Sequence, residues 1–163
     1  MIKMKTPGGR GLFQSVRQLR FGFSPGGLLA FALVMLPNLL WLIAPPLNDP
    51  LAANSAPSAF LELLEHASQW VLVATLVLLV NREKGRRSRV FLFAAALPLG
   101  GYYALWAAYY AGMSPAWLLL GLAVLPPLFF CLAAVWLKNW AALPPAVVFG
   151  LAHIAVTCSN YLT

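Results

Sequence analysis

Charged side chains are scarce in this sequence: they make up 9% of its 163 residues, and only four residues are acidic. A water-soluble domain carries about 25% charged residues, because it covers its core with a wetted surface. Hydrophobic residues account for 61% of this chain, and they gather in runs of the roughly 20 residues that cross a bilayer. The composition therefore excludes a soluble globular domain and predicts an integral membrane protein.

The motifs of several functional classes are also missing. No P-loop is present, which excludes ATP-driven transport by this chain alone, and neither an H-E-x-x-H helix nor a zinc-spaced histidine pair occurs. The G-x-S-x-G motif, which positions the nucleophilic serine in serine hydrolases, is absent as well. The two cysteines, Cys131 and Cys158, lie in separate apolar runs toward opposite faces of the membrane, so we expect no disulfide. We assign no catalytic residue, metal site or cofactor.

The basic residues are clustered rather than spread along a face. The formal net charge is +7, but a nucleic-acid surface would interleave lysine and arginine with exposed aromatic residues. Here one cluster lies in residues 1–24 and the other in "NREKGRRSR", residues 81–89. Because both clusters flank apolar runs, we expect a lipid bilayer as the partner and no nucleic acid.

The basic clusters also predict a topology. With five spans and a cytoplasmic N-terminus, all eleven lysines and arginines fall on the cytoplasmic side, as the bias of basic loop residues requires. The fold class is thus an all-α bundle of five transmembrane helices with an external C-terminus, in the plasma (inner) membrane. The spans are expected at about 26–44, 59–80, 90–111, 115–137 and 140–161, and aromatic residues near their ends fit an interfacial belt, namely Trp41, Tyr109, Tyr110, Trp117, Trp136, Trp140 and Tyr161.

The chain divides into a basic arm, residues 1–24, and a single helical bundle, residues 25–163. Within the arm, Leu12, Val16, Leu19 and Phe23 recur at helical spacing. This spacing favours a short helix lying on an anionic membrane surface. A disordered tail is an equally good interpretation, because glycines precede Leu12.

Polar residues form stripes on the expected spans. On a helix that advances 100° per residue, Glu62, Glu65, His66 and Gln69 share one face of the second span. Ionisable groups at membrane depth are costly and face a bundle interior or a hydrated cavity. We therefore predict a ligand-binding pocket in the outer leaflet where this stripe meets one on the fifth span and a residue of the first. Its candidate residues are Asn38, Glu62, Glu65, His66, Gln69, His153, Thr157 and Asn160.

Three functions fit this pattern. The first is a non-enzymatic membrane module that binds a small or lipid-like molecule, or a membrane partner, through the polar pocket, with protonation of Glu65 or His66 tuning the binding. The second is a membrane-embedded enzyme that uses Glu65, His66 and His153 for acid–base or metal chemistry. The third is a structural subunit whose stripes pack against other membrane subunits or a second copy of the chain, with His153 as interhelical glue.

Overall fold

The computed structural model describes residues 19–81 and 88–162. This part of the chain contains five helices that are long and apolar enough to cross a membrane. Each coincides to within a few residues with a span expected from the sequence, so the all-helical fold is confirmed. The helices are α2 (Pro25–Ile43), α3 (Ala59–Leu78), α4 (Arg89–Tyr110), α5 (Ala116–Trp136) and α6 (Leu143–Tyr161), with short 3-10 helices at η1 (Pro50–Ala53) and η2 (Trp140–Ala142).

Local chemistry explains where the helices begin. Ser24 and Ser58 precede α2 and α3, and each hydroxyl accepts a hydrogen bond from a backbone N–H of the first helical turn. Such N-caps satisfy donors that have no partner within the helix. Helices α2 and α6 carry proline in the first turn, where the missing N–H costs nothing. Pro144 and Pro145 therefore lie in the first turn of α6, where proline does not break the helix.

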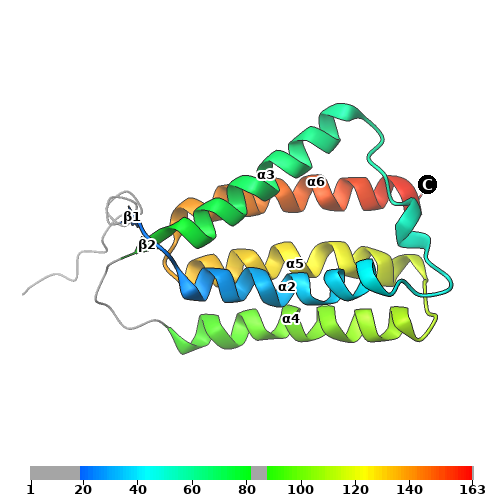
Figure 1. Cartoon of the computed structure of the whole chain (residues 1–163), viewed down its shortest axis with the longest axis horizontal. Helices are drawn as coiled ribbons and strands as arrows, with labels where there is room; N and C mark the ends of the chain where they lie inside the picture. Colours follow the sequence, from blue (N-terminus) through cyan, green and yellow to red (C-terminus); the bar gives the residue numbers. More distant parts are fainter. Residues whose placement is uncertain (1–18, 82–87, 163) are drawn as a thin grey trace, which may run out of the picture.

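Helix α5 is the centre of the bundle. It lies between α4 and α6, while α2 runs alongside and α3 packs on α6 (Figure 1). More than half of its apolar stretch is buried, at 56%. The core cluster gathers around its side chains, including Leu118, Leu122 and Phe130. Both cysteines are free, in agreement with their placement in separate spans.

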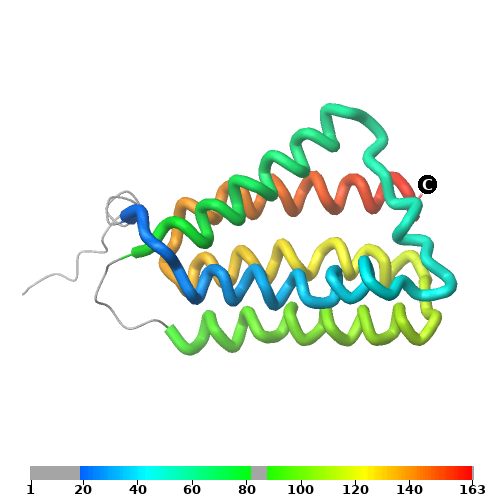
Figure 2. The backbone as a smooth tube through the Cα atoms, in the orientation of Figure 1, coloured from blue at the N-terminus to red at the C-terminus, as the bar shows by residue number. Residues whose placement is uncertain are grey.

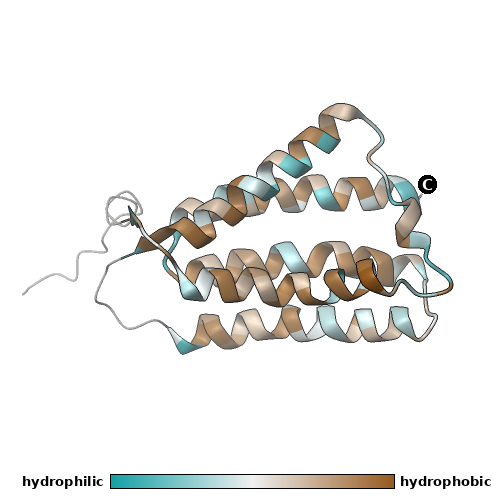
Figure 3. Ribbon diagram, in the orientation of Figure 1, coloured by the Kyte–Doolittle hydropathy of each residue, from teal (hydrophilic) through white to brown (hydrophobic). Residues whose placement is uncertain are grey.

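The bundle has two chemically different ends. The end where α2 and α4 begin carries Arg20, Arg89 and Lys138, and we call it the basic end. The opposite end carries the connection 44–58 and the end of α6, and we call it the loop end (Figure 2). Between the ends the helices consist mostly of apolar residues, and polar segments appear on the loop-end halves of α3 and α6 (Figure 3).

A two-stranded ribbon closes the basic end. Strand β1 (Leu19–Phe21) pairs antiparallel with β2 (Leu79–Asn81), which directly continues α3. The helix expected around Leu19 is therefore wrong over residues 19–21, and the rest of that prediction lies outside the described residues. The backbone of β2 supplies the physical reason, because its exposed hydrogen-bonding groups pair with an extended chain and not with a helix.

Helices α2 and α3 touch closely at the basic end and then separate. A Cβ atom built on Gly27 would lie 1.9 Å from the carbonyl oxygen of Leu76, so only glycine permits this crossing. From there α3 diverges steadily from α2 toward the loop end (Figure 1). The two helices are therefore farther apart at the loop end than at the basic end (Figure 1).

The connection 44–58 is tied to the helices around it. The carboxylate of Asp49 accepts hydrogen bonds from the Trp41 indole and the Tyr109 hydroxyl. On the other side, the Asn160 amide donates to the Asn54 side chain and to the Ser55 carbonyl. These bonds fix the connection across the loop end of the bundle.

The crossing at Gly27 generates the first prediction. Gly27→Ala should lower the free energy of unfolding by roughly 1–3 kcal/mol, as overpacking does, because the backbone of α3 must move away. Gly100→Ala is the matched control, since no atom lies within 4 Å of its added Cβ, and alanine should be better in a helix by about 0.5–1 kcal/mol. Thermal unfolding in detergent measures both. Equal midpoints for the two variants would contradict the close crossing.

Candidate functional site

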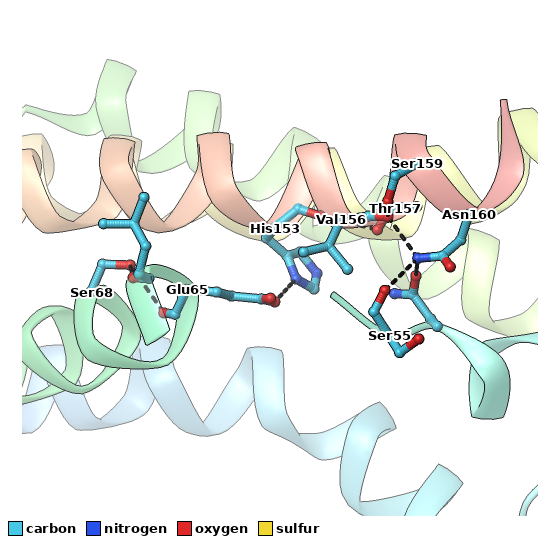
Figure 4. Close-up of polar contacts among 10 residues, drawn as sticks. Ser55, Glu65, Ser68, His153, Val156, Thr157, Ser159 and Asn160 are labelled. Atoms are coloured by element: carbon cyan, nitrogen blue, oxygen red, sulfur yellow. Dashed lines mark hydrogen bonds and ion pairs between the residues drawn. The ribbon is translucent and has the colours of Figure 1, made fainter. Parts of the chain in front are cut away.

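The site is organised by a carboxylate and an imidazole that face each other across two helices. Glu65 Oε1 of α3 lies 2.6 Å from His153 Nδ1 of α6 (Figure 4). The two side chains are largely buried, with 16% of Glu65 and 28% of His153 exposed. Because an ionised carboxylate can only accept a hydrogen bond, Nδ1 then carries the proton. The acidic stripe of α3 and the histidine stripe of α6 therefore meet at these residues.

The imidazole is also held from within its own helix. Its ring stacks on Phe149, one turn earlier in α6, with 5.2 Å between ring centroids and 20° between planes. The backbone of α6 lies close to α5 here, because a Cβ on Gly150 would be 2.7 Å from Pro127 Cβ. Stacking on one side and the carboxylate on the other orient His153 toward α3.

A cavity of about 340 Å³ opens beside this pair. Its volume lies at the lower end of the range for small-molecule sites, which is about 300–1,000 Å³. Buried side chains of α4, α5 and α6 form its floor, and half-buried side chains of α2 and α3 form its rim. The floor includes Tyr102, Trp106, Leu119, Leu122, Pro126, Phe130 and Phe149, and the rim includes Phe31, Met35, Asn38, Trp41, Gln69 and Val73.

Most of the residues predicted for the pocket line this cavity. They come from α2, α3 and α6, which lie far apart in the sequence. Asn38 donates to the Tyr102 hydroxyl at 2.7 Å and to the Val34 carbonyl. Thr157 donates to the His153 carbonyl in the preceding turn. The predicted residues that the structure brings to the cavity are Asn38, Glu65, Gln69, His153 and Thr157.

The other predicted residues lie elsewhere. Glu62 and His66 are exposed and line a second hollow of about 310 Å³, which shares Glu65 and Asn54 with the cavity. Asn160 holds the connection 44–58 through Asn54 and Ser55 (Figure 4). These residues share a face with Glu65 or His153, but Glu62 and Asn160 lie nearer the loop end, and His66 lines the second hollow instead of the cavity. The single outer pocket expected from the stripes is thus divided into a cavity, a hollow and a loop contact.

Sequence reasoning missed the aromatic part of the site. Tyr102 and Trp106 lie one turn apart on α4, are 2% and 5% exposed, and stack edge to face. The indole N–H of Trp106 has no hydrogen-bond partner within the described residues. Trp41, which is expected in the interfacial belt, also lines the cavity and donates its indole N–H to Asp49. The four-residue spacing of Tyr102 and Trp106 was the available signal, because it places both on one helix face.

The described residues do not support a metal-binding site. Residues 19–81 and 88–162 contain no group of three or more histidine, cysteine, aspartate or glutamate side chains placed to hold a metal ion. His66 is exposed and lines the second hollow, while His153 lines the cavity. The pair that remains, Glu65 and His153, can exchange a proton or bind a polar group.

No protein-family model matches this chain, and no curated protein or solved structure matches it either. Its function therefore has to be inferred from the geometry and chemistry of the cavity.

The second prediction concerns the strength of the central pair. In a double-mutant cycle with Glu65→Gln and His153→Gln, the coupling free energy should be about 1–3 kcal/mol, since the two largely buried groups are in direct contact. The matched cycle uses Glu62→Gln and His66→Gln, which are exposed and one turn apart, and its coupling should stay below about 0.5 kcal/mol. Thermal or denaturant unfolding in detergent gives both values. A central coupling no larger than the control would show that the contact contributes nothing.

Proposed function

We propose that this protein is a non-enzymatic, multi-pass membrane module that binds a small lipid-like molecule in the cavity between α2 and α3. The observation that carries the proposal is the Glu65–His153 pair at the edge of a largely apolar cavity. Ligand sites are typically apolar concave surfaces with a few convergent polar groups that orient the ligand. This cavity has that composition.

The placement of the polar groups supports binding rather than helix packing alone. An interhelical hydrogen bond that served only as glue would need no adjoining space. Here the pair borders a cavity of about 340 Å³, and Gln69 adds a further polar side chain to its rim. A buried polar network without a ligand would tend to close tightly, because protein interiors pack to high density. The open volume therefore favours an occupant.

The orientation proposed from the sequence agrees with the chemistry of the two ends. Arg20, Arg89 and Lys138 lie at the basic end, whereas Asp49 and Glu62 lie toward the loop end. We place the basic end in the cytoplasm, following the bias of basic loop residues. The cavity then lies in the outer half of the bilayer, below the connection 44–58.

The third prediction tests for an occupant. Native mass spectrometry of the protein extracted in mild detergent should detect a bound species of lipid-like mass. Val73→Trp should reduce its occupancy at least about fivefold, because the larger side chain fills the rim of a cavity that must stay open for a ligand. Val71→Trp is the matched control, since Val71 is exposed and outside the cavity lining. An adduct absent from the wild type, or retained equally by both variants, would overturn the proposal.

The fourth prediction tests the orientation. In a background with Cys131→Ala and Cys158→Ala, Leu47→Cys should react with a membrane-impermeant maleimide in intact cells, because Leu47 is exposed at the loop end. Gly85→Cys, between the basic residues of 81–89, should react only after the cells are permeabilised. The reverse pattern would invert the topology.

A further inference from the structure

We infer that the ligand is an uncharged single-chain amphiphile whose head group carries both a hydrogen-bond donor and an acceptor, such as a hydroxyl or amide, and that it enters sideways between α2 and α3. This inference rests on the proposed function and specifies its ligand. It follows from the walls of the cavity, its closed ends and the polar groups that reach it.

The side chains on different sides of the cavity differ in their solvent exposure, and this difference indicates where the cavity opens. Tyr102, Trp106 and Leu119 on the floor are buried, whereas Met35 and Val73 on the rim are half-buried. The rim residues belong to α2 and α3, the helices that diverge toward the loop end (Figure 1). The opening therefore lies on the side of the bundle and is bordered mostly by apolar side chains, with Asn38 and Gln69 as the polar members of the rim.

The two ends of the cavity are closed. At the basic end, the contact of Gly27 with the Leu76 backbone and the buried Leu72 fill the space between α2 and α3. At the loop end, Leu51 and Asn54 of the connection cover the cavity, and the Leu51 N–H donates to the Tyr109 hydroxyl at 3.2 Å. A side opening between helices that are apolar enough to span a membrane admits molecules dissolved in the lipid phase.

The polar and charged side chains that line the cavity indicate which charge the head group of the ligand can carry. Among the described residues, no lysine or arginine lines the cavity. An anionic head would therefore lose its hydration without gaining a counter-charge, which is costly in an apolar site. Glu65 offers an acceptor and already has His153 as its partner, so the wall needs no cationic ligand to balance it.

The amide of Gln69 adds the requirement for an acceptor. Gln69 is half-buried and lines the cavity. Its amide nitrogen can only donate a hydrogen bond, and a ligand oxygen would accept it. An ammonium group can donate to Glu65 but offers no lone pair to Gln69, whereas a hydroxyl or amide serves both.

The volume limits the size of the ligand. A water molecule takes about 30 Å³ of liquid volume, so the cavity of about 340 Å³ has room for roughly eleven groups of that size. This space suits a head group and the first part of one chain, with the rest of the chain extending through the opening into the lipid.

The experiment compares three probes with the same twelve-carbon length: 1-lauroyl glycerol, laurate and dodecylammonium. Each is titrated into the protein in nanodiscs, and native mass spectrometry gives the fraction bound. We expect 1-lauroyl glycerol to bind at least about tenfold more tightly than either charged probe, because only its head avoids burying an unpaired charge.

Matched variants assign the binding to the groups named above. Gln69→Leu should weaken binding of 1-lauroyl glycerol about fivefold, through the lost hydrogen bond, whereas Thr75→Val, which is half-buried on α3 and outside the cavity lining, should not. Met35→Trp, at the opening, should slow uptake at least about fivefold. Leu36→Trp, which is exposed and outside the cavity lining, should leave the rate unchanged.

The outcomes separate the two proposals. Preference for a charged probe, or equal binding by Gln69→Leu, overturns the assigned head chemistry but leaves a ligand-binding module. If Met35→Trp takes up the ligand at the same rate as the wild type, the proposed side opening is wrong. If none of the probes binds, or if Val73→Trp binds them as the wild type does, the ligand class fails, and the adduct measurement on the purified protein decides whether the proposed function fails with it.

Discussion

The contact between Glu65 and His153 is the interaction on which the site depends. A carboxylate that is largely buried needs a partner, because an unpaired charge in an apolar environment is strongly destabilising. The partner lies 88 residues away in the sequence, so the contact sets the rotation of α3 and α6 about their axes. Once these rotations are fixed, Gln69 and Thr157 necessarily face the same cavity.

A second constraint comes from the crossing of α2 and α3. These helices approach to backbone contact at Gly27 and Leu76, and the ribbon of β1 and β2 ties their ends together. They are joined at the basic end and diverge beyond it (Figure 1), and side chains of both helices line the cavity. The polar pair lies where they diverge, and the connection 44–58 covers the cavity.

The sequence predicted the helices well because each span is a long apolar run bounded by proline, serine or charged residues. It also predicted that the stripes around Glu65 and His153 face each other, since ionisable residues in an apolar helix avoid lipid. The pattern could not tell which members of a stripe reach the cavity. Glu62 and Asn160 share the right faces, but the splay of α3 and the position of the loop place them nearer the loop end.

Other features of the site depend on tertiary contacts that periodicity does not encode. Trp41, which is expected in an interfacial belt, also donates its indole N–H to Asp49 at the loop end. The strand at Leu19–Phe21 forms only because β2 extends from α3 to pair with it. Tyr102 and Trp106 line the cavity because α4 packs against α5, and periodicity alone does not show which helices pack together.

The most direct test is an experimental structure of the protein in a lipid nanodisc. It should show Glu65 and His153 in contact, α2 and α3 diverging toward the loop end, and non-protein density in the cavity that reaches the side chain of Gln69 from between those helices. A structure in which α2 closes against α3 along its whole length, or in which Glu65 turns toward the acyl chains, would contradict the account.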